Sequence, residues 1–403
     1  MKYLILVPDG CADWSIPALG GKTPLEAANL KYINTLARVS EVGMVKTIPD
    51  GIPPGSDAAN LSVMGYDPSV YLTGRSPLEA VSMGVDMSDT DVAFRVNLVT
   101  LEGDGRYEDL IIKDHSSGDI PGEEAHILIK MIENELGGGD VHFYPGVSYR
   151  HAMIVANGHT DYQMTPPHDI LTKRVGDYLP KGRDAGEIEQ MMRKSYELLK
   201  DHPVNLERKK NGLNLASSIW IWGQGRKPRL PSLHSLYGVN GAIVAAVDLI
   251  KGIGLCAGLS AIDVPGATGT LHTNYKGKAD CAIKAFSDGS DFIYIHVEAP
   301  DECAHQGDLD GKLKSLEHID EEIFKPVSEY LADSGEHYRI LIVPDHRTPM
   351  EIRTHSSESV PFVLFDSKLA LSEDEGKAFS ESAGERGGFY DSGCALAKHF
   401  FNV

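Results

Sequence analysis

The sequence predicts an α/β protein with a mostly parallel main sheet flanked by helices, and with a smaller α+β domain inserted into it. Near both chain ends, short apolar runs alternate with segments of helical periodicity, as in strand–helix–strand units. In the middle of the chain, β-type segments dominate and only two long helical patterns occur. We therefore expect residues 1–88 and 232–403 to form one domain, and residues 89–231 to form the insertion.

Apolar runs and their spacing predict the elements of the main domain. Apolar residues spaced three and four apart predict a helix over residues 312–331. A second helix is predicted over residues 239–250, ended by Gly252. Buried strands are predicted at residues 3–7, 43–48, 292–297, 339–343 and 361–365.

The insertion has a different pattern. Its long helical patterns cover residues 122–136 and 185–201. Its β segments are expected at residues 93–100, 107–112, 141–144 and 150–155.

Composition excludes several classes of protein. Lys plus Arg number 38 against 58 Asp plus Glu, a net charge of −20, which repels nucleic acid and anionic membranes. The five cysteines are odd in number and lack Cys-x-x-Cys spacing, so a disulfide framework or a cysteine zinc site is not expected. The first apolar run is too short for a signal peptide, and the longest apolar stretch, residues 241–262, contains charges. We expect a cytoplasmic protein without nucleic-acid or membrane partners.

Three of the predicted strands end in the same way, with a proline followed by an aspartate: Asp9, Asp301 and Asp345. Residues just past the carboxyl ends of parallel strands meet in one crevice. Three carboxylates there repel one another unless cations hold them. A pair of divalent metals would satisfy this arrangement. The similar Pro49-Asp50 pair is taken as an ordinary turn.

Histidines follow two of these aspartates. His305 lies four residues after Asp301, so the two share a face if this segment is helical. His346 directly follows Asp345, and His355 lies nine residues further on. Mixed carboxylate and imidazole ligands suit zinc or manganese better than calcium.

Ser56 is the candidate nucleophile. It follows Pro53-Pro54-Gly55 at the predicted start of a helix. It could serve only as the helix N-cap. Alternatively, it points into the metal cluster, where the helix N-terminus favours an incoming anion and a metal lowers the serine pKa.

Taken together, these motifs resemble those of the archaeal-type 2,3-bisphosphoglycerate-independent phosphoglycerate mutases, a family of the alkaline phosphatase superfamily. The motifs run in family order over nearly the whole chain. They are Val7-Pro8-Asp9-Gly10, Gly55-Ser56-Asp57-Ala58-Ala59-Asn60, Thr73-Gly74-Arg75-Ser76-Pro77, Gly146-Val147-Ser148-Tyr149-Arg150-His151, Trp222-Gly223-Gln224-Gly225, Glu298-Ala299-Pro300-Asp301-Glu302 with His305, and Asp345-His346-Arg347-Thr348-Pro349 with His355.

The resemblance implies an alkaline-phosphatase-like fold and a role for each motif. Ser56 would carry the phosphoryl group while 3-phosphoglycerate and 2-phosphoglycerate interconvert, without added 2,3-bisphosphoglycerate. Two divalent ions are implied, manganese first, with magnesium, zinc or cobalt as alternatives. The resemblance assigns one ion to Asp9, Ser56, Asp345 and His346, and the other to Asp301, His305 and His355. The insertion would hold glycerate and close over the site.

A phosphoglycerate is an anion, so a chain of charge −20 needs local positive groups to bind it. We expect Arg75 and Arg150 to contact the substrate. Lys276 and Lys278 are both candidates for contacting the phosphoryl group, and Lys278 is included in the expected site. Asp114 and His151 are candidates for the substrate pocket and for moving a proton between the glycerate hydroxyls.

A second interpretation uses the same Ser56 and the same metals. In it the protein is a phosphatase or another phosphotransferase, such as a homoserine kinase-like enzyme, and the insertion binds a different substrate. A non-catalytic metal-binding protein is disfavoured because all the ligands and the nucleophile are present. The sequence leaves the oligomeric state open.

Overall fold

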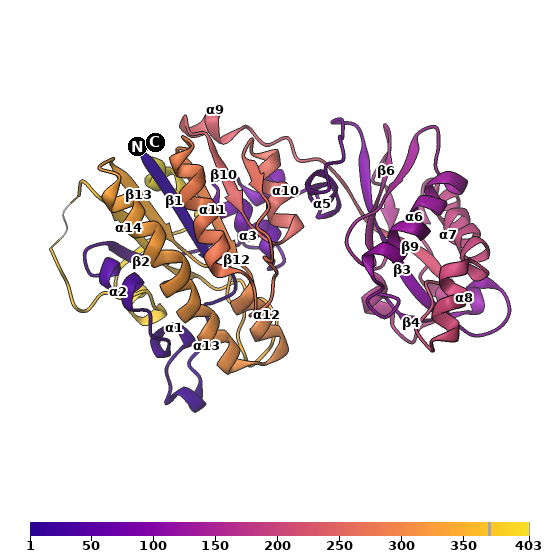
Figure 1. Ribbon diagram of the computed structural model, residues 1–403, viewed down its shortest axis with the longest axis horizontal. Coiled ribbons are helices and arrows are strands. Elements are labelled where there is room, and N and C mark those ends of the chain that lie inside the picture. The colour runs from indigo at the N-terminus through magenta and orange to yellow at the C-terminus, as the bar shows by residue number, and fades with distance from the viewer. Residues whose placement is uncertain (370–371, 403) are drawn as a thin grey trace. The chain divides into compact units, whose positions relative to one another are not determined.

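The structure, a computed structural model, describes residues 1–369 and 372–402 and divides into two compact units (Figure 1). The first unit comprises Met1–Leu72 and the described part of Arg229–Val403, and the second is Thr73–Pro228. We expected the insertion at 89–231. The second unit begins earlier because helix α5 (Ser76–Ser82) packs on strands of that unit. No helix within the described ranges has the length and apolar character needed to cross a bilayer.

A mostly parallel sheet organises the first unit, as the sequence predicts. Only β14 runs antiparallel to its two neighbours, and the other pairs are parallel. In spatial order the strands are β11 (Ser260–Ile262), β10 (Gly241–Val244), β12 (Phe292–Val297), β1 (Lys2–Pro8), β13 (Tyr338–Ile342), β14 (Val360–Asp366), β2 (Glu41–Val45) and β15 (Gly388–Tyr390).

Helices cover both faces of this sheet (Figure 1). The longer ones are α2 (Lys31–Ala37), α3 (Ser56–Val63), α10 (Asp248–Cys256), α11 (Tyr275–Ser287), α12 (Ala299–Gln306), α13 (Leu309–His318), α14 (Lys325–Asp333) and α16 (Gly393–Phe401). Short segments are η1 (Pro17–Leu19), α1 (Pro24–Ala27), α4 (Pro68–Tyr71), α9 (Leu233–Tyr237), η5 (Ile319–Phe324) and α15 (Glu381–Gly384).

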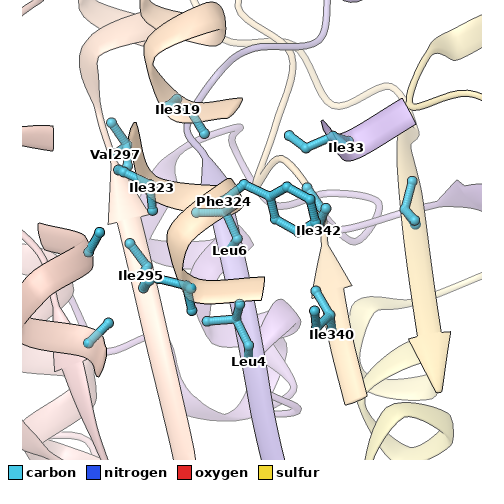
Figure 2. Packing of buried hydrophobic residues seen from close by; sticks show 14 of the residues in the cluster. Leu4, Leu6, Ile33, Ile295, Val297, Ile319, Ile323, Phe324, Ile340 and Ile342 are labelled. Carbon is cyan, nitrogen blue, oxygen red and sulfur yellow. The ribbon is translucent and has the colours of Figure 1, made fainter. Parts of the chain in front are cut away.

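Strand β1 contributes to both faces because its side chains alternate. Leu4 and Leu6 join the core under η5, where Phe324 is buried among the side chains of the three central strands (Figure 2). Tyr3 points the other way and contacts the rings of Phe400 and Phe401 in α16. The central strand is therefore buried on both sides, which fixes where its carboxyl end lies.

The helix predicted over residues 312–331 is two helices, α13 and α14, joined by the π-helical segment η5. Asp320 in η5 accepts hydrogen bonds from the backbone N–H groups of Tyr32 and Ile33. These are unpaired donors at the start of α2, so Asp320 caps a helix that lies nearly 300 residues away in sequence.

One prediction for the main domain is wrong. Residues 239–250 do not form a helix, because strand β10 occupies Gly241–Val244 and α10 begins only at Asp248. The apolar run is short and pairs with a strand on each edge. Periodicity alone cannot separate a short buried strand from a buried helical segment. The predicted strand at 43–48 is also displaced, since β2 ends at Val45.

The second unit contains a five-stranded antiparallel sheet. Helices α6 and α7 share a core with one face, and α5 packs on the other through Ala80. The sheet strands are β3 (Val92–Glu102), β4 (Ile111–Asp114), β5 (Val141–Tyr144), β6 (Arg150–Val155) and β9 (Ser218–Arg226), and a separate pair is β7 (Tyr162–Gln163) with β8 (Lys181–Gly182). The helices are α5, α6 (Gly122–Leu136), α7 (Ala185–Lys200), α8 (Pro203–Lys210), η2 (Tyr107–Asp109), η3 (Pro167–Ile170) and η4 (Val175–Asp177).

The α+β character of this unit agrees with the sequence, but two details differ. Residues 107–112 were expected to be a strand, and they begin as the 3₁₀ turn η2. Strand β9, which pairs along much of β3, has no counterpart in the predicted set.

A buried ion pair ties the chain end to the main sheet. Arg339 on β13 lies with its Nε 2.7 Å from Asp366 Oδ2 on β14. The Arg339 guanidinium also donates to the carbonyls of His399 and Phe400 in α16. His337 Nε2 lies 2.6 Å from the other Asp366 oxygen. Burial opposes ionisation of Asp366, but the Lys368 N–H, His337 and Arg339 together hold the pKa of its carboxyl below the ordinary value.

We predict that in Asp366→Asn the free energy of unfolding falls less steeply than in wild type as the pH is lowered. A carboxyl whose pKa is lowered by folding stabilises the protein above its unfolded pKa of about 4, and this stabilisation is lost as pH falls through the folded value. Urea unfolding between pH 6 and pH 3, at about half-unit steps, measures this slope. The exposed Asp333→Asn serves as the control. A variant with the wild-type slope would contradict the prediction.

Candidate active site

Three neighbouring parallel strands deliver the three strand-end aspartates to one edge of the sheet. β12, β1 and β13 are adjacent, with β1 in the middle. Asp9 directly follows β1, and Asp345 lies three residues beyond β13. Asp301 lies in the first turn of α12, which follows β12. All three are buried, as the Pro-Asp pattern predicts for one shared crevice.

One group of ligand atoms surrounds the Nε2 atom of His346. Asp9 Oδ1 lies 3.6 Å from it and Asp345 Oδ2 lies 3.5 Å from it. Asp9, Asp345 and His346 are close enough together to hold one metal ion. Asp9 Oδ1 is buried and has no hydrogen-bond partner among the described residues. An ion in this group would satisfy that oxygen.

A second group surrounds Asp301. His305 Nε2 lies 3.0 Å from Asp301 Oδ2, and His355 Nε2 lies 3.5 Å from Asp301 Oδ1. The Nε2 atoms of these two histidines are 3.1 Å apart. Asp301 and His305 lie on one face of α12, as their spacing predicts. Asp301, His355 and His346 also lie close enough together to hold an ion, so His346 borders both groups.

The backbone orients the ring of His305. Its Nδ1 lies 2.9 Å from the carbonyl of Arg353, so Nδ1 donates its proton there and Nε2 faces Asp301. The hydrogen bond to Asp301 raises the pKa of His305 to about 9, so without a cation Nε2 also carries a proton, which a bound metal would displace. Arg353 presents this carbonyl from a left-handed conformation, with φ at 52°.

Burial and like charges make the cluster unfavourable without cations. Burial, together with the carboxylates of Asp345 and Asp301, raises the pKa of Asp9 well above its ordinary value. Burial also lowers the pKa of His346, which favours the neutral imidazole that metals bind. The donor set is mixed carboxylate and imidazole, and it fits a divalent transition metal.

Ser56 faces this cluster. It is the first residue of α3, and the N-cap is Gly55, which makes no side-chain cap hydrogen bond. The interpretation of Ser56 as a simple N-cap is therefore not supported. Its Oγ lies 3.1 Å from His346 Nε2, on the side of the first ligand group.

Asn60 is a site residue that the sequence argument did not assign. Its side-chain amide donates to Asp345 Oδ2 at 2.8 Å and to the Ser56 carbonyl at 2.8 Å. Its carbonyl accepts from the hydroxyl of Tyr294 on β12. A polar residue four positions after Ser56, between Ala59 and Leu61, was the available signal. Asn60 links Ser56 and Asp345.

His296 was also not assigned a role. It lies on β12 beside Val7, and its Nε2 is 3.1 Å from Asp9 Oδ2. Burial lowers its pKa to about 4, so the ring is neutral at physiological pH. Lys278, expected at the phosphoryl group, is buried on α11 and donates to the His296 carbonyl at 3.1 Å. Burial lowers the pKa of Lys278 to about 8.

The other four expected substrate residues belong to the second unit. Arg75 occupies the N-cap position of α5, and Arg150 begins β6, where it is exposed beside the ring of Tyr149. His151 is buried, its Nδ1 accepts from the Gly146 N–H, and burial lowers its pKa to about 3. Asp114 closes a turn. Its carboxylate accepts hydrogen bonds from the backbone N–H groups of two later residues, from a serine hydroxyl and from an asparagine side-chain amide.

Buried polar contacts hold the two loops that carry Asp9 and His346. Lys312 Nζ lies 2.8 Å from Asp13 Oδ2 and also donates to the Thr348 carbonyl. Asp13 in turn accepts from the Met350 N–H. Arg347 donates to the Asp13 carbonyl and forms isolated bridges with the loop after β1. These contacts fix the loops after β1 and β13 against each other.

Comparison with known proteins gives consistent matches to one family, and the relatives match over nearly the whole chain. The family model described as 2,3-bisphosphoglycerate-independent phosphoglycerate mutase matches residues 37–205. The protein of that name from Methanosarcina barkeri is 47% identical over 388 residues, which is 96% of each chain.

Two solved structures are also similar. The PH0037 protein from Pyrococcus horikoshii has a TM-score of 0.80 and 29% identity, and the match covers 100% of this chain and 97% of that one. The cofactor-independent phosphoglycerate mutase from Thermoplasma acidophilum has a TM-score of 0.67 at 24% identity, with full coverage of both chains, and supports the fold.

We predict that Lys312→Met lowers the free energy of unfolding by about 3–5 kcal/mol, because it leaves the buried Asp13 carboxylate without its cation. Adding Asp13→Asn removes that charge, so the double variant loses less stability. The exposed Lys314→Met, on the same helix, is the control. Urea unfolding of the three variants measures the differences. Equal losses in the single and double variants would show that the unpaired Asp13 carboxylate is not the cause of the lost stability.

Proposed function

Since this chain belongs to the family of 2,3-bisphosphoglycerate-independent phosphoglycerate mutases, we propose that it interconverts 3-phosphoglycerate and 2-phosphoglycerate through a phosphoserine at Ser56. The observation that carries the proposal is the position of the Ser56 hydroxyl, 3.1 Å from His346 Nε2 beside the buried carboxylates. Cytoplasmic location is part of the proposal, in keeping with five free cysteines.

Two divalent ions, manganese in preference to magnesium, zinc or cobalt, are part of this proposal. Asp9, Asp345, His346 and Ser56 would hold one, and Asp301, His305 and His355 the other. The unpartnered Asp9 oxygen and the closeness of Asp9, Asp345 and His346 support the first assignment. For the second, Asp301 and His355 lie close enough to share an ion, but together with His346, and His305 is proposed because its Nε2 lies 3.0 Å from Asp301 Oδ2. When bound, the ions lower the pKa of the serine hydroxyl and neutralise charge on the phosphoryl oxygens.

The residues of the chain position the nucleophile and receive the anion. Ser56 begins α3, so the dipole of that helix favours a phosphoryl group next to its Oγ. Asn60 holds the Ser56 carbonyl and Asp345 at once. In the proposed reaction, Ser56 Oγ loses its proton and forms a bond to phosphorus as the bond between phosphorus and the C3 oxygen breaks. The C3 oxygen takes up one proton and becomes a hydroxyl, so no net proton is released. The reverse steps deliver the phosphoryl group to the C2 hydroxyl.

The second unit would hold glycerate between the two transfers and exclude water. Arg75 and Arg150 are the proposed contacts to the carboxylate, because guanidinium groups bind carboxylates through paired hydrogen bonds. For the half-buried Asp114, its hydrogen bonds to the following turn and to Asn214 support a role in shaping the unit. His151 stays a candidate for the substrate pocket, because its buried Nε2 has no hydrogen-bond partner among the described residues. Lys278 supports the strand that carries His296. A phosphatase on the same residues would release phosphate instead, and the family matches do not favour that alternative.

We predict that Ser56→Ala abolishes turnover, by at least about 10³-fold, because no other group replaces the nucleophile. The assay couples 2-phosphoglycerate formation to enolase, with manganese and without 2,3-bisphosphoglycerate. Inorganic phosphate release is recorded in parallel. The exposed Ser69→Ala is the matched control and should retain wild-type turnover. Phosphate release without isomerisation would replace the mutase proposal with the phosphatase alternative.

We predict that removal of metal by a chelator stops turnover and that added manganese restores it. The same treatment should lower thermal stability, since the cluster then keeps its buried carboxylates without cations. Differential scanning calorimetry of the chelated and reloaded protein measures the change. Full activity after exhaustive chelation would contradict the proposed metal site.

A further inference from the structure

One buried hydroxyl lies between the two ligand groups. The Oγ1 atom of Thr348 is hydrogen-bonded to Asp301 Oδ1 and lies 3.2 Å from His346 Nδ1. Thr348 is fully buried, so water does not compete for these contacts. Asp301 belongs to one group and His346 borders both. Thr348 therefore connects the groups without being a ligand itself.

The direction of these hydrogen bonds follows from counting protons. A metal-binding carboxylate offers only acceptors, so the single hydroxyl proton of Thr348 must be donated to Asp301. The hydroxyl can then only accept from His346, so His346 carries its proton on Nδ1. Its Nε2 lone pair is left facing Asp9, Asp345 and Ser56.

The surroundings hold the Thr348 hydroxyl in place. The Thr348 N–H donates to the Ala12 carbonyl at 3.2 Å, and its own carbonyl accepts from Lys312 at 2.9 Å. Gly10 closes the space beside it, because a Cβ there would come within 2.5 Å of the Thr348 hydroxyl and of Asp301 Oδ1. Gly10 also has φ at 59°, a conformation that favours glycine. The side chain of Thr348 has little freedom to turn away.

We propose that Thr348 is a positioning residue that fixes His346 as the Nδ1-protonated tautomer and thereby couples the two metal groups. This inference rests on the proposed metal-dependent function. Partners that orient a metal-binding histidine through its second nitrogen set both the ring angle and the available lone pair. Here the same hydroxyl also orients the aspartate of the other group, so its loss affects both.

Binding of Mn²⁺ to the chelated protein tests the coupling. Thr348→Val keeps the shape of the side chain and removes the hydroxyl, whereas Thr348→Ser keeps the hydroxyl. We expect Thr348→Val to bind Mn²⁺ about 10–100-fold more weakly at both sites, and Thr348→Ser to bind within a few-fold of wild type. Paramagnetic resonance of free Mn²⁺ gives affinity and stoichiometry. Urea unfolding of the metal-free variants shows whether each is folded.

The tautomer can be read in the wild-type protein, and a variant is needed only to assign the signals. Ring ¹⁵N shifts of metal-free protein labelled at histidine distinguish a proton on Nδ1 from one on Nε2. The His346 signals are those lost in His346→Asn. We expect Nδ1 to carry the proton, and a proton on Nε2 would overturn the inference.

The outcomes separate this inference from the proposed function. If wild type binds no Mn²⁺, the proposed metal-dependent function fails. If wild type binds Mn²⁺ and Thr348→Val binds it equally well, only the role of Thr348 fails. Weak binding by both Thr348→Ser and Thr348→Val would show that packing, and not the hydroxyl, is what matters, and would also overturn the inference.

Discussion

Asp9, Asp301 and Asp345 follow the ends of three neighbouring strands of the main sheet. The sheet therefore brings three buried carboxyl groups together at one edge. Burial and mutual repulsion raise the pKa of Asp9, and one of its oxygens has no partner in the described part of the chain. The free energy gained by burying apolar side chains on the sheet offsets this repulsion, so the strands stay in place. The cluster thereby becomes a strong site for cations.

Other features of the first unit keep the cluster in a fixed geometry. The Lys312–Asp13 ion pair is buried, and it holds the loop that carries His346. Asn60 performs the corresponding task from α3, joining Ser56 to Asp345. A buried polar group without a hydrogen-bond partner destabilises the fold, whereas a fully paired one holds its side chain in a single orientation. Here they orient ligands that the hydrophobic core could not orient by itself.

The sequence was sufficient for the parts of the fold and candidate site that depend on local pattern. The strand-end aspartates, the Asp301–His305 helical turn and the parallel sheet follow from periodicity and spacing. The strand at Gly241–Val244 was mistaken for helix, because a short apolar run supports either assignment. The roles of Asn60 and Thr348 were not predicted because each depends on a partner that is distant in the sequence. Asn60 contacts Asp345, 285 residues later, and Thr348 contacts Asp301, 47 residues earlier. For Asn60 the only local signal is a polar residue four positions after Ser56, and nothing near Thr348 in the sequence indicates its contact with Asp301.

The central position of β1 has a consequence for how the chain folds. Its two neighbours, β12 and β13, lie almost 300 and more than 330 residues later, beyond the whole of the second unit. During synthesis both edges of β1 therefore stay unpaired until most of the chain has left the ribosome. The second unit is continuous in sequence and can close its own core earlier. Pairings this distant are slow to form, so the cluster of aspartates is among the last parts of the molecule to assemble.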